Sequence, residues 1–137
     1  MIENDLAKQA LDIAFKIHRE LGPGLFESVY EEIFCYELDQ VGVKYSRQTP
    51  ISISYEDIKI SKAFIADIVL EDKWLIELKS VKSLQPVHKK QLLTYLKLTN
   101  MRLGLLINFN EALLKNGIKR VVNNLWPLAT PPSRNAK

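Results

Sequence analysis

The chain has 137 residues, of which 47% are hydrophobic and 26% charged, and its formal net charge is +3 at pH 7. This length and composition predict one ordinary globular domain and exclude two of normal size. The single cysteine, Cys35, excludes a disulfide framework and a cysteine-based zinc site. The polar start lacks the apolar segment of a secretory signal, and no apolar run is long enough to cross a bilayer. We therefore expect a cytoplasmic protein without membrane contact, whose mildly basic charge permits a nucleic-acid partner.

Two helices are predicted at the start of the chain. Apolar residues recur with helical spacing over residues 4–21, and the glycine-proline-glycine cluster at residues 22–24 must interrupt that helix. A second helix is predicted from Phe26 to Val41, where Gly42 follows in the position of a helix-ending glycine.

After the second helix the pattern changes to the alternation of apolar and polar residues that is typical of strands. Isoleucine and serine alternate at residues 51–54, and Glu56-Asp57 indicates a turn. Residues 115–123 fit a short strand or a short helix equally well. The other predicted elements are strands over residues 59–70 and 74–81, a helix from Pro86 to about Leu98, and a buried strand over residues 103–109.

These elements predict a single α/β domain over residues 1–125, followed by a proline-rich polar tail over residues 126–137. Their order is helix, helix, three strands, helix and strand. We expect this order to produce a mixed central β-sheet flanked by helices.

Charged residues lie in the middle of the predicted hairpin FIADIVLEDKWLIELKS, residues 64–80. If residues 71–73 form its loop, Asp67 lies opposite Glu77, and Lys79 shares the face of Glu77. The other face is then wholly apolar, which supports this register because a slip of one residue would mix the two faces. The loop contains no glycine, so its turn type stays open. The pairs expected in this register are Ala66–Leu78, Ile68–Ile76, Leu70–Trp74 and Val69–Leu75.

Two facing carboxylates destabilise a sheet, and partial burial adds a desolvation cost, so positive charge is needed close to them. Lys79 supplies part of that charge. A hard divalent cation would supply the rest, because Mg²⁺ in proteins is bound by carboxylates together with water and substrate phosphate. The alternative is an edge hairpin whose acidic and lysine side chains are simply solvated.

A polar stripe is predicted on the third helix, directly after the charged strand. Gln91 and Tyr95 are four residues apart and share a helix face, and His88 lies three residues before Gln91. Amide, phenol and imidazole groups suit contacts to a phosphate or to a metal-bound water. The alternative is a solvated helix face with a half-buried tyrosine.

Glu27 lies in the first turn of the second predicted helix, between Gly24 and Tyr30. An acid in this position is favoured by the helix dipole, which is the simpler explanation. The functional alternative is that Glu27 adds a further carboxylate to the same metal site.

Basic residues are scattered over the third helix and the last predicted element. They suit contact with a phosphate backbone, and the alternative is ordinary solvated surface. These residues are Lys89, Lys90, Lys115, Lys119 and Arg120.

Taken together, these residues resemble the PD-(D/E)XK nuclease superfamily. Asp67 and the run Glu77-Leu78-Lys79 match its D…ExK core, although Ala66 stands where its motif begins with proline. The run Gln91-Leu92-Leu93-Thr94-Tyr95 matches the QxxxY helix of its RecB-like and Cas4-like exonuclease branches. Each motif is weak alone, and their order and spacing make the combined match specific.

More narrowly, the chain resembles the small bacterial GxxExxY proteins. Gly24, Glu27 and Tyr30 match the motif that names them. The stretches IELKSV, HKKQLLTYLK, GLLINFN and GIKRVV are also similar, so the resemblance extends over about residues 18–123.

The resemblance implies a restriction-endonuclease-like core and hydrolysis of phosphodiester bonds that depends on Mg²⁺ or Mn²⁺. Lys79 would orient the attacking water, and Gln91 and Tyr95 would position the scissile phosphate or that water. The implied metal ligands are Asp67, Glu77, Glu27 and the backbone carbonyl of Leu78. The implied contacts to nucleic acid are His88, Lys89, Lys90, Lys119 and Arg120.

The rival expectation is a non-catalytic module that keeps this fold and binds nucleic acid or a protein. For either function, DNA is favoured over RNA as the nucleic acid. A domain of this size has no obvious specificity module, so we expect a homodimer or a partner protein.

Overall fold

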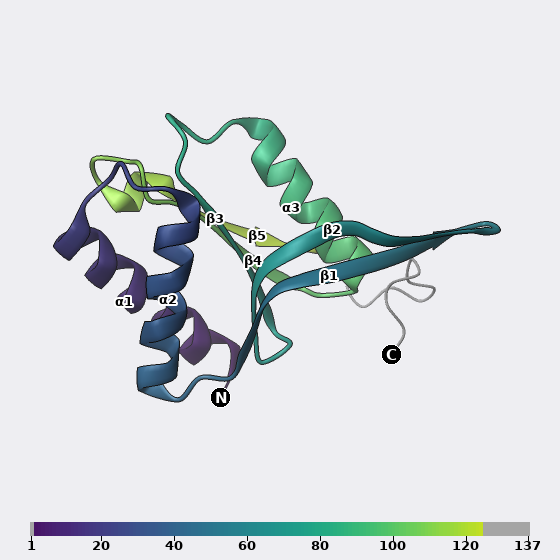
Figure 1. Cartoon of the computed structure of the whole chain (residues 1–137), viewed down its shortest axis with the longest axis horizontal. Coiled ribbons are helices and arrows are strands. Elements are labelled where there is room, and N and C mark those ends of the chain that lie inside the picture. The colour runs from purple at the N-terminus through teal and green to yellow at the C-terminus, as the bar shows by residue number, and fades with distance from the viewer. Residues whose placement is uncertain (1, 125–137) are drawn as a thin grey trace.

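A five-stranded mixed β-sheet forms the centre of the structure, a computed structural model that describes residues 2–124 (Figure 1). The sheet order follows the chain order, with β3 and β4 parallel and the other neighbours antiparallel. The strands are β1 (Tyr45–Tyr55), β2 (Ile58–Leu70), β3 (Trp74–Lys79), β4 (Leu103–Asn108) and β5 (Ile118–Val122).

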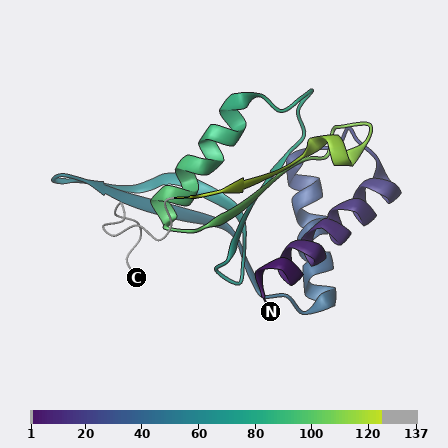
Figure 2. The ribbon, with the colours of Figure 1, turned by 180° about the vertical axis from the view of Figure 1, so that it is seen from behind.

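Helices cover both faces of the sheet (Figures 1 and 2). α1 (Glu3–Leu21) and α2 (Glu27–Val41) pack on one face, where Trp74, Ile76 and Leu78 of β3 enter the larger buried cluster. α3 (Pro86–Thr99) packs on the other face, where Leu75 of β3 enters the smaller cluster. Successive residues of a strand point to opposite faces, so β3 supplies both cores, and Glu77 falls on the α3 side by the same alternation.

The predicted α/β class and mixed sheet are confirmed, and most predicted boundaries lie within one or two residues of the observed ones. β1 begins at Tyr45, ahead of the alternating pattern at residues 51–54. The ambiguous segment 115–123 contains a short 3-10 helix, η1 (Leu114–Gly117), and then β5. Gly42 ends α2 with a left-handed φ of 73°, as predicted. The predicted tail, residues 126–137, lies outside the described residues.

The β2–β3 register is confirmed close to the turn and departs from the prediction further along. Ile68–Ile76, Val69–Leu75 and Leu70–Trp74 pair as expected. Glu71 and Asp72 both adopt a left-handed φ, of 47° and 56°, which a type I′ turn requires at its two central positions.

The expected pairing of Ala66 with Leu78 is wrong. Ala66 packs in the cluster under α3, whereas Leu78 packs in the cluster under α1 and α2. The reason is that β2 stays paired with β1 along its length while its pairing with β3 ends at Ile68–Ile76. Strand twist then carries β2 away from β3 at Asp67.

Beyond this point, β1 and β2 continue as a two-stranded arm that projects from the molecule (Figure 1). We use the term arm for residues 54–63, all of which are exposed. Its turn is the predicted one at Glu56-Asp57. Large apolar side chains are exposed on it, Tyr55 at 65% and Ile58 at 60%. Among residues 2–124, no helix combines the length and apolar character that a bilayer span requires.

Candidate active site

The carboxylates of Asp67 and Glu77 meet where β2 and β3 separate. Glu77 accepts a hydrogen bond from the backbone N–H of Asp67 at 3.1 Å. Asp67 in turn accepts one from the backbone N–H of Leu78 at 3.0 Å. Side-chain oxygens thus satisfy two strand N–H groups at the junction. Each carboxylate is thereby fixed to the strand that carries the other one.

Burial and mutual repulsion disfavour the charged form of this pair. Glu77 is only 7% exposed. Burial first, and then the charge of Asp67, raises the pKa of Glu77 to about 8. The pKa of Asp67 is also raised, chiefly by burial, while the N–H of Leu78 and the charge of Lys79 lower it. The charged form of the pair is therefore disfavoured in the absence of a cation, because Lys79 offsets burial and repulsion only in part.

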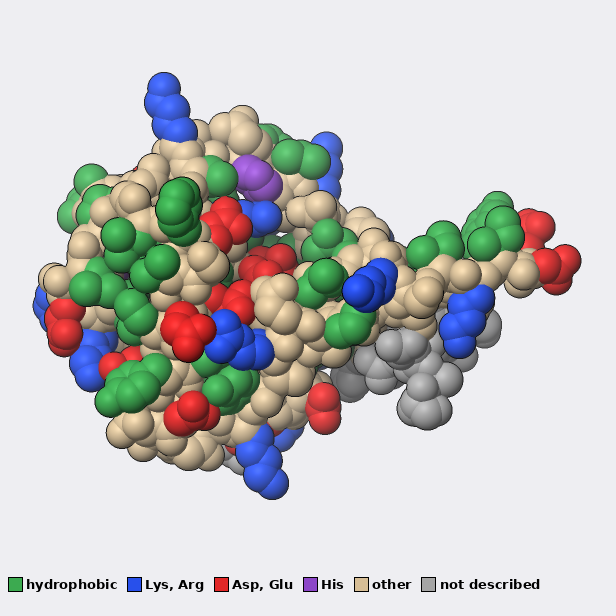
Figure 3. Space-filling model, viewed as in Figure 1, with side chains coloured by type: hydrophobic (Ala, Val, Ile, Leu, Met, Phe, Trp, Pro, Cys, Tyr) green, Lys and Arg blue, Asp and Glu red, His purple; other side chains and the backbone are tan. Residues whose placement is uncertain are grey.

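A cleft of about 510 Å³ opens beside Asp67, between α2 and the base of the hairpin, and Glu77 does not line it. Acidic side chains gather around a hollow on this face of the molecule (Figure 3). Glu27 is fixed at its edge, where its carboxylate accepts a hydrogen bond from the backbone N–H of Ser80 at 3.2 Å. The cleft is lined by Glu27, Ser28, Glu31, Gln48, Asp67 and Leu78.

Tyr30 holds the loop that precedes Glu27. Its hydroxyl donates to the carbonyl of Gly22 at 2.6 Å and accepts from the N–H of Leu25 at 3.2 Å. Its ring is fully buried and stacks on Phe109 with centroids 4.4 Å apart. Tyr30 therefore fixes the conformation of the loop that leads to Glu27.

The polar stripe of α3 reaches the same site through Tyr95. Its ring stacks on Phe64 of β2, with centroids 3.8 Å apart. Burial raises the pKa of Tyr95, and the charges of Glu77 and Asp67 raise it further, so the phenol lies within the field of the acidic pair. Gln91 is exposed one turn earlier on the helix.

His88 caps α3. Its Nδ1 accepts a hydrogen bond from the backbone N–H of Gln85 at 2.9 Å, and the Gln85 side chain caps the helix in return. The imidazole is thus engaged in helix capping, which is a structural role.

The candidate basic residues do not form one continuous patch. Lys89 and Lys90 are exposed on α3 and line a shallow hollow together with Arg120. The Arg120 guanidinium lies 5.2 Å from the centroid of the Trp74 ring. Lys119 and Arg120 are neighbours on β5, so their side chains point to opposite faces of the sheet.

Three cleft residues, Ser28, Glu31 and Gln48, were not predicted. Glu31 is buried, and its position four residues after Glu27 on α2 was a usable signal, since such residues share a helix face. Gln48 had no comparable signal, because it lies ahead of the alternating pattern by which a strand was predicted. Its Nε2 donates to Glu31 Oε1 at 2.6 Å and to Asp67 Oδ1 at 3.4 Å.

The donors around the cleft fit a hard divalent cation by their chemistry. They are the carboxylates of Glu27, Glu31 and Asp67, and carboxylate oxygens are ligands that Mg²⁺ and Mn²⁺ prefer. A cation would also stabilise the charged forms of Asp67 and Glu77, which burial first and neighbouring carboxylates second disfavour. Within residues 2–124, however, no three His, Cys, Asp or Glu side chains are grouped closely enough to hold a metal ion. Both central carboxylates accept hydrogen bonds from strand N–H groups instead.

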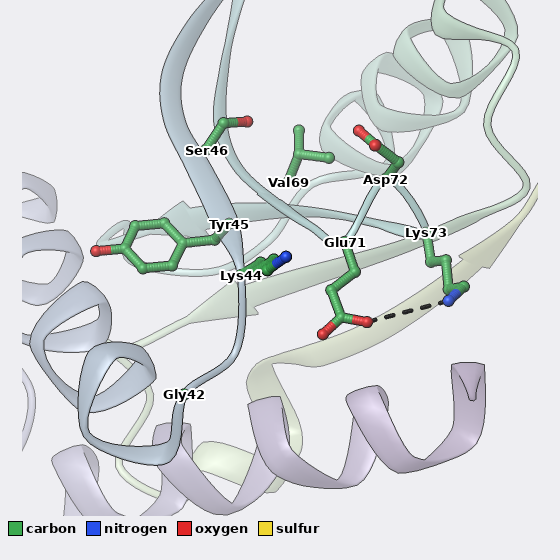
Figure 4. A pocket seen from close by; sticks show the side chains of 8 residues that line it. All are labelled: Gly42, Lys44, Tyr45, Ser46, Val69, Glu71, Asp72 and Lys73. Atoms are coloured by element: carbon green, nitrogen blue, oxygen red, sulfur yellow. Dashed lines mark ion pairs between the residues drawn. The ribbon is translucent and has the colours of Figure 1, made fainter. Parts of the chain in front are cut away.

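A second hollow, of about 540 Å³, lies at the other end of the β2–β3 hairpin (Figure 4). It is lined by Gly42, Lys44, Tyr45, Ser46, Val69, Glu71, Asp72 and Lys73. Glu71 turns toward Lys73 there, and their charged atoms are 4.0 Å apart. This hollow contains neither Asp67 nor Glu77, so it is not part of the candidate site.

A family model of the PD-(D/E)XK nuclease superfamily matches residues 4–121. This range contains every residue named above as a candidate for catalysis, metal binding or nucleic-acid contact. The predicted restriction-endonuclease-like fold, a mixed sheet with helices on both faces, is confirmed by this match. No curated protein and no solved structure matched the chain.

Proposed function

The chain belongs to the PD-(D/E)XK nuclease superfamily, and we propose on that basis that it is a divalent-metal-dependent nuclease that hydrolyses phosphodiester bonds. The observation that carries this proposal is the pair of crossed hydrogen bonds that fixes Asp67 and Glu77 at one strand junction. A solvated edge hairpin would not bury an acidic pair in this way.

In this proposal, Mg²⁺ or Mn²⁺ is bound by Asp67, Glu77, the carbonyl of Leu78 and Glu27. A bound cation would act as a Lewis acid toward the phosphate and would make water more acidic. The cleft position of Glu27 supports its inclusion, because its charge raises the pKa of both central carboxylates.

Lys79 is proposed to orient the attacking water and to stabilise negative charge that builds on the phosphate. Its ammonium lowers the pKa of both Asp67 and Glu77, so it acts on the same small region. Gln91 and Tyr95 are proposed to hydrogen-bond the scissile phosphate from the α3 side. Lys89 and Lys90 are proposed to contact the phosphate backbone further along, with His88, Lys119 and Arg120 as weaker candidates.

We also propose the narrower assignment to the bacterial GxxExxY group, with the QxxxY helix of the RecB-like and Cas4-like branches. The support is that Gly24 lies in the loop before α2 with a left-handed φ of 102°, that the Tyr30 hydroxyl holds this loop, and that Glu27 begins the helix at the cleft, so the three motif residues share one structural task. DNA is the favoured substrate, and a homodimer or a partner protein the favoured assembly.

The test is to incubate purified protein with single- and double-stranded DNA and RNA, with Mg²⁺, with Mn²⁺ and with EDTA. We expect metal-dependent cleavage that Asp67→Ala and Lys79→Ala both abolish. Lys59→Ala, at an exposed lysine of the arm, is the matched control and should cleave normally. Cleavage that survives both site substitutions would come from a contaminant and would defeat the proposal.

A non-catalytic binding module is the second candidate. The observation in its favour is the lack, within the described residues, of a ready group of three metal-ligating side chains. Titration with Mn²⁺ separates the two candidates: a nuclease should bind the ion in a manner that depends on Asp67 and Glu77. A protein that binds nucleic acid but no Mn²⁺ would support the binding module.

A further inference from the structure

Gln48 joins two carboxylates that belong to different parts of the fold. Its side-chain amide donates to Glu31 on α2 at 2.6 Å and to Asp67 on β2 at 3.4 Å. An amide nitrogen carries two hydrogens, so one group can donate to both acids at once. Both neighbours are acceptors, which fixes the orientation of the amide, because its carbonyl would be repelled there.

Glu31 is held on its other side by Arg47. The guanidinium donates from Nε at 3.1 Å, and its Nη2 lies 2.9 Å from the same Oε2 atom. Each Glu31 oxygen therefore has a partner, Oε1 with Gln48 and Oε2 with Arg47. Glu31 is thereby directed toward β1, although it lines the same cleft as Asp67.

The backbone of Gln48 is in an unfavourable conformation. Its φ of 49° is in the left-handed region, which glycine adopts readily and glutamine does not. The conformation occurs inside β1, where Arg47 and Thr49 on either side keep regular pairing with β2. Strain of this kind persists where the surrounding structure requires the side chain at that position.

We propose that Gln48 is a positioning residue that orients Asp67 for metal binding and keeps Glu31 out of the ligand set. This assignment rests on the proposed nuclease function, because it concerns the same site. One oxygen of Asp67 is fixed by the Leu78 N–H and the other by Gln48, so the carboxylate has a single orientation. Without the amide, Glu31 and Asp67 would face each other as two anions across the cleft.

The simpler explanation is that Gln48 only braces β1 against α2. The two explanations differ at Gln48→Gly. Glycine adopts the left-handed backbone without strain, and it lacks the side-chain amide. If Gln48 only braces β1, a Gln48→Gly protein that is as stable as the wild type should bind metal normally. A positioning role predicts weaker metal binding in a protein that is at least as stable as the wild type.

The experiment measures Mn²⁺ affinity by calorimetry, the kcat and KM of cleavage, and the Tm without metal. The variants are Gln48→Met, which keeps the length without a donor, Gln48→Gly, and Gln48→Glu, which adds a further carboxylate to the cleft. Gln40→Met, at an exposed glutamine of α2, is the matched control.

We expect Gln48→Met and Gln48→Gly to weaken Mn²⁺ binding by about 10-fold, the usual size of an effect on residues that orient metal ligands. The kcat of both variants should fall by a similar factor with little change in KM. Gln48→Glu should show larger losses of Mn²⁺ affinity and of kcat. The Tm of Gln48→Gly should equal or exceed that of the wild type, and Gln40→Met should behave as wild type throughout.

Wild-type Mn²⁺ affinity in Gln48→Met would overturn the assignment. So would losses of affinity that merely follow losses of Tm across the variants. If the wild type binds Mn²⁺ through Asp67 but cleaves no nucleic acid, the nuclease proposal fails, while the Mn²⁺ series still decides the role of Gln48. A wild type that binds no Mn²⁺ would overturn both.

Discussion

The two ends of the β1–β2 hairpin differ sharply in what surrounds them. At its base, Asp67 is held by the N–H of Leu78 on β3 and by the amide of Gln48, and Ile68 beside it is fully buried. In the arm, Ile58 and Ile60 are exposed on a ribbon that no helix covers. β1 and β2 pair with each other at both ends, so strand pairing alone does not cause the difference. Burial does, because only a desolvated carboxylate has a strongly raised pKa and a large interaction with its neighbours.

The largest expected contrast between the two ends is in catalysis. We expect Asp67→Asn to lower kcat by at least about 100-fold, because it removes charge at the reacting centre without changing shape. Lys62→Met, on the arm of the same strand, should change kcat by less than about twofold, within the usual effect of a surface substitution. Single-turnover cleavage of a labelled DNA measures both. Equal losses in the two variants would mean that the arm belongs to the active site.

Substitutions at the two ends of the hairpin should also differ clearly in their effect on the free energy of unfolding. Ile68→Ala removes a fully buried side chain that pairs with Ile76, and it should cost about 2–5 kcal/mol. Ile58→Ala, at an exposed position of the arm, should change stability by less than about 0.5 kcal/mol. Urea unfolding followed by circular dichroism gives both values. A large cost for Ile58→Ala would show that the arm is covered in solution.

The acidic pair should make the metal-free protein less stable as the pH rises. The pKa of Glu77 is raised to about 8 in the folded protein from its usual value of 4.5. Between these values the folded state keeps a proton that the unfolded state loses, so stability falls from pH 4.5 to pH 8. The raised pKa of Asp67 acts in the same direction.

Glu77→Gln isolates this contribution, since glutamine is neutral at every pH. We expect it to raise the metal-free Tm at pH 8 by roughly 3–10 °C, with little change at pH 4.5, while it abolishes cleavage. Thermal scans of both proteins in EDTA across this range are the measurement. Parallel pH profiles for variant and wild type would contradict the raised pKa.

A smaller effect is expected at the loop before α2. Tyr30→Phe keeps the stacking on Phe109 and removes the hydroxyl that binds Gly22 and Leu25. The loss of these hydrogen bonds should cost roughly 1–2 kcal/mol. Because the loop places Glu27, Mn²⁺ affinity should fall as well. Tyr36→Phe, at an exposed tyrosine of α2, is the matched control and should alter neither stability nor affinity.

Local sequence patterns determined the elements and much of the candidate site. Period-two and helical spacing placed the helices and strands, and the all-apolar face from Ile68 to Trp74 established the hairpin register around its turn. Those patterns also put Asp67, Glu77 and Lys79 on one predicted face. They work because side-chain direction along a helix or strand depends on position in the chain alone.

Only the tertiary structure decided which other groups reach that face. Gln48 meets Asp67 through a strained residue inside β1, and Glu31 approaches from a helix folded over the other side of the cleft. β2 separates from β3 at Asp67, so two hydrogen bonds to side-chain carboxylates replace the predicted strand pair. This separation depends on the twist that accumulates over the whole hairpin. Periodicity specifies the face on which a residue lies, and long-range packing specifies what it meets there.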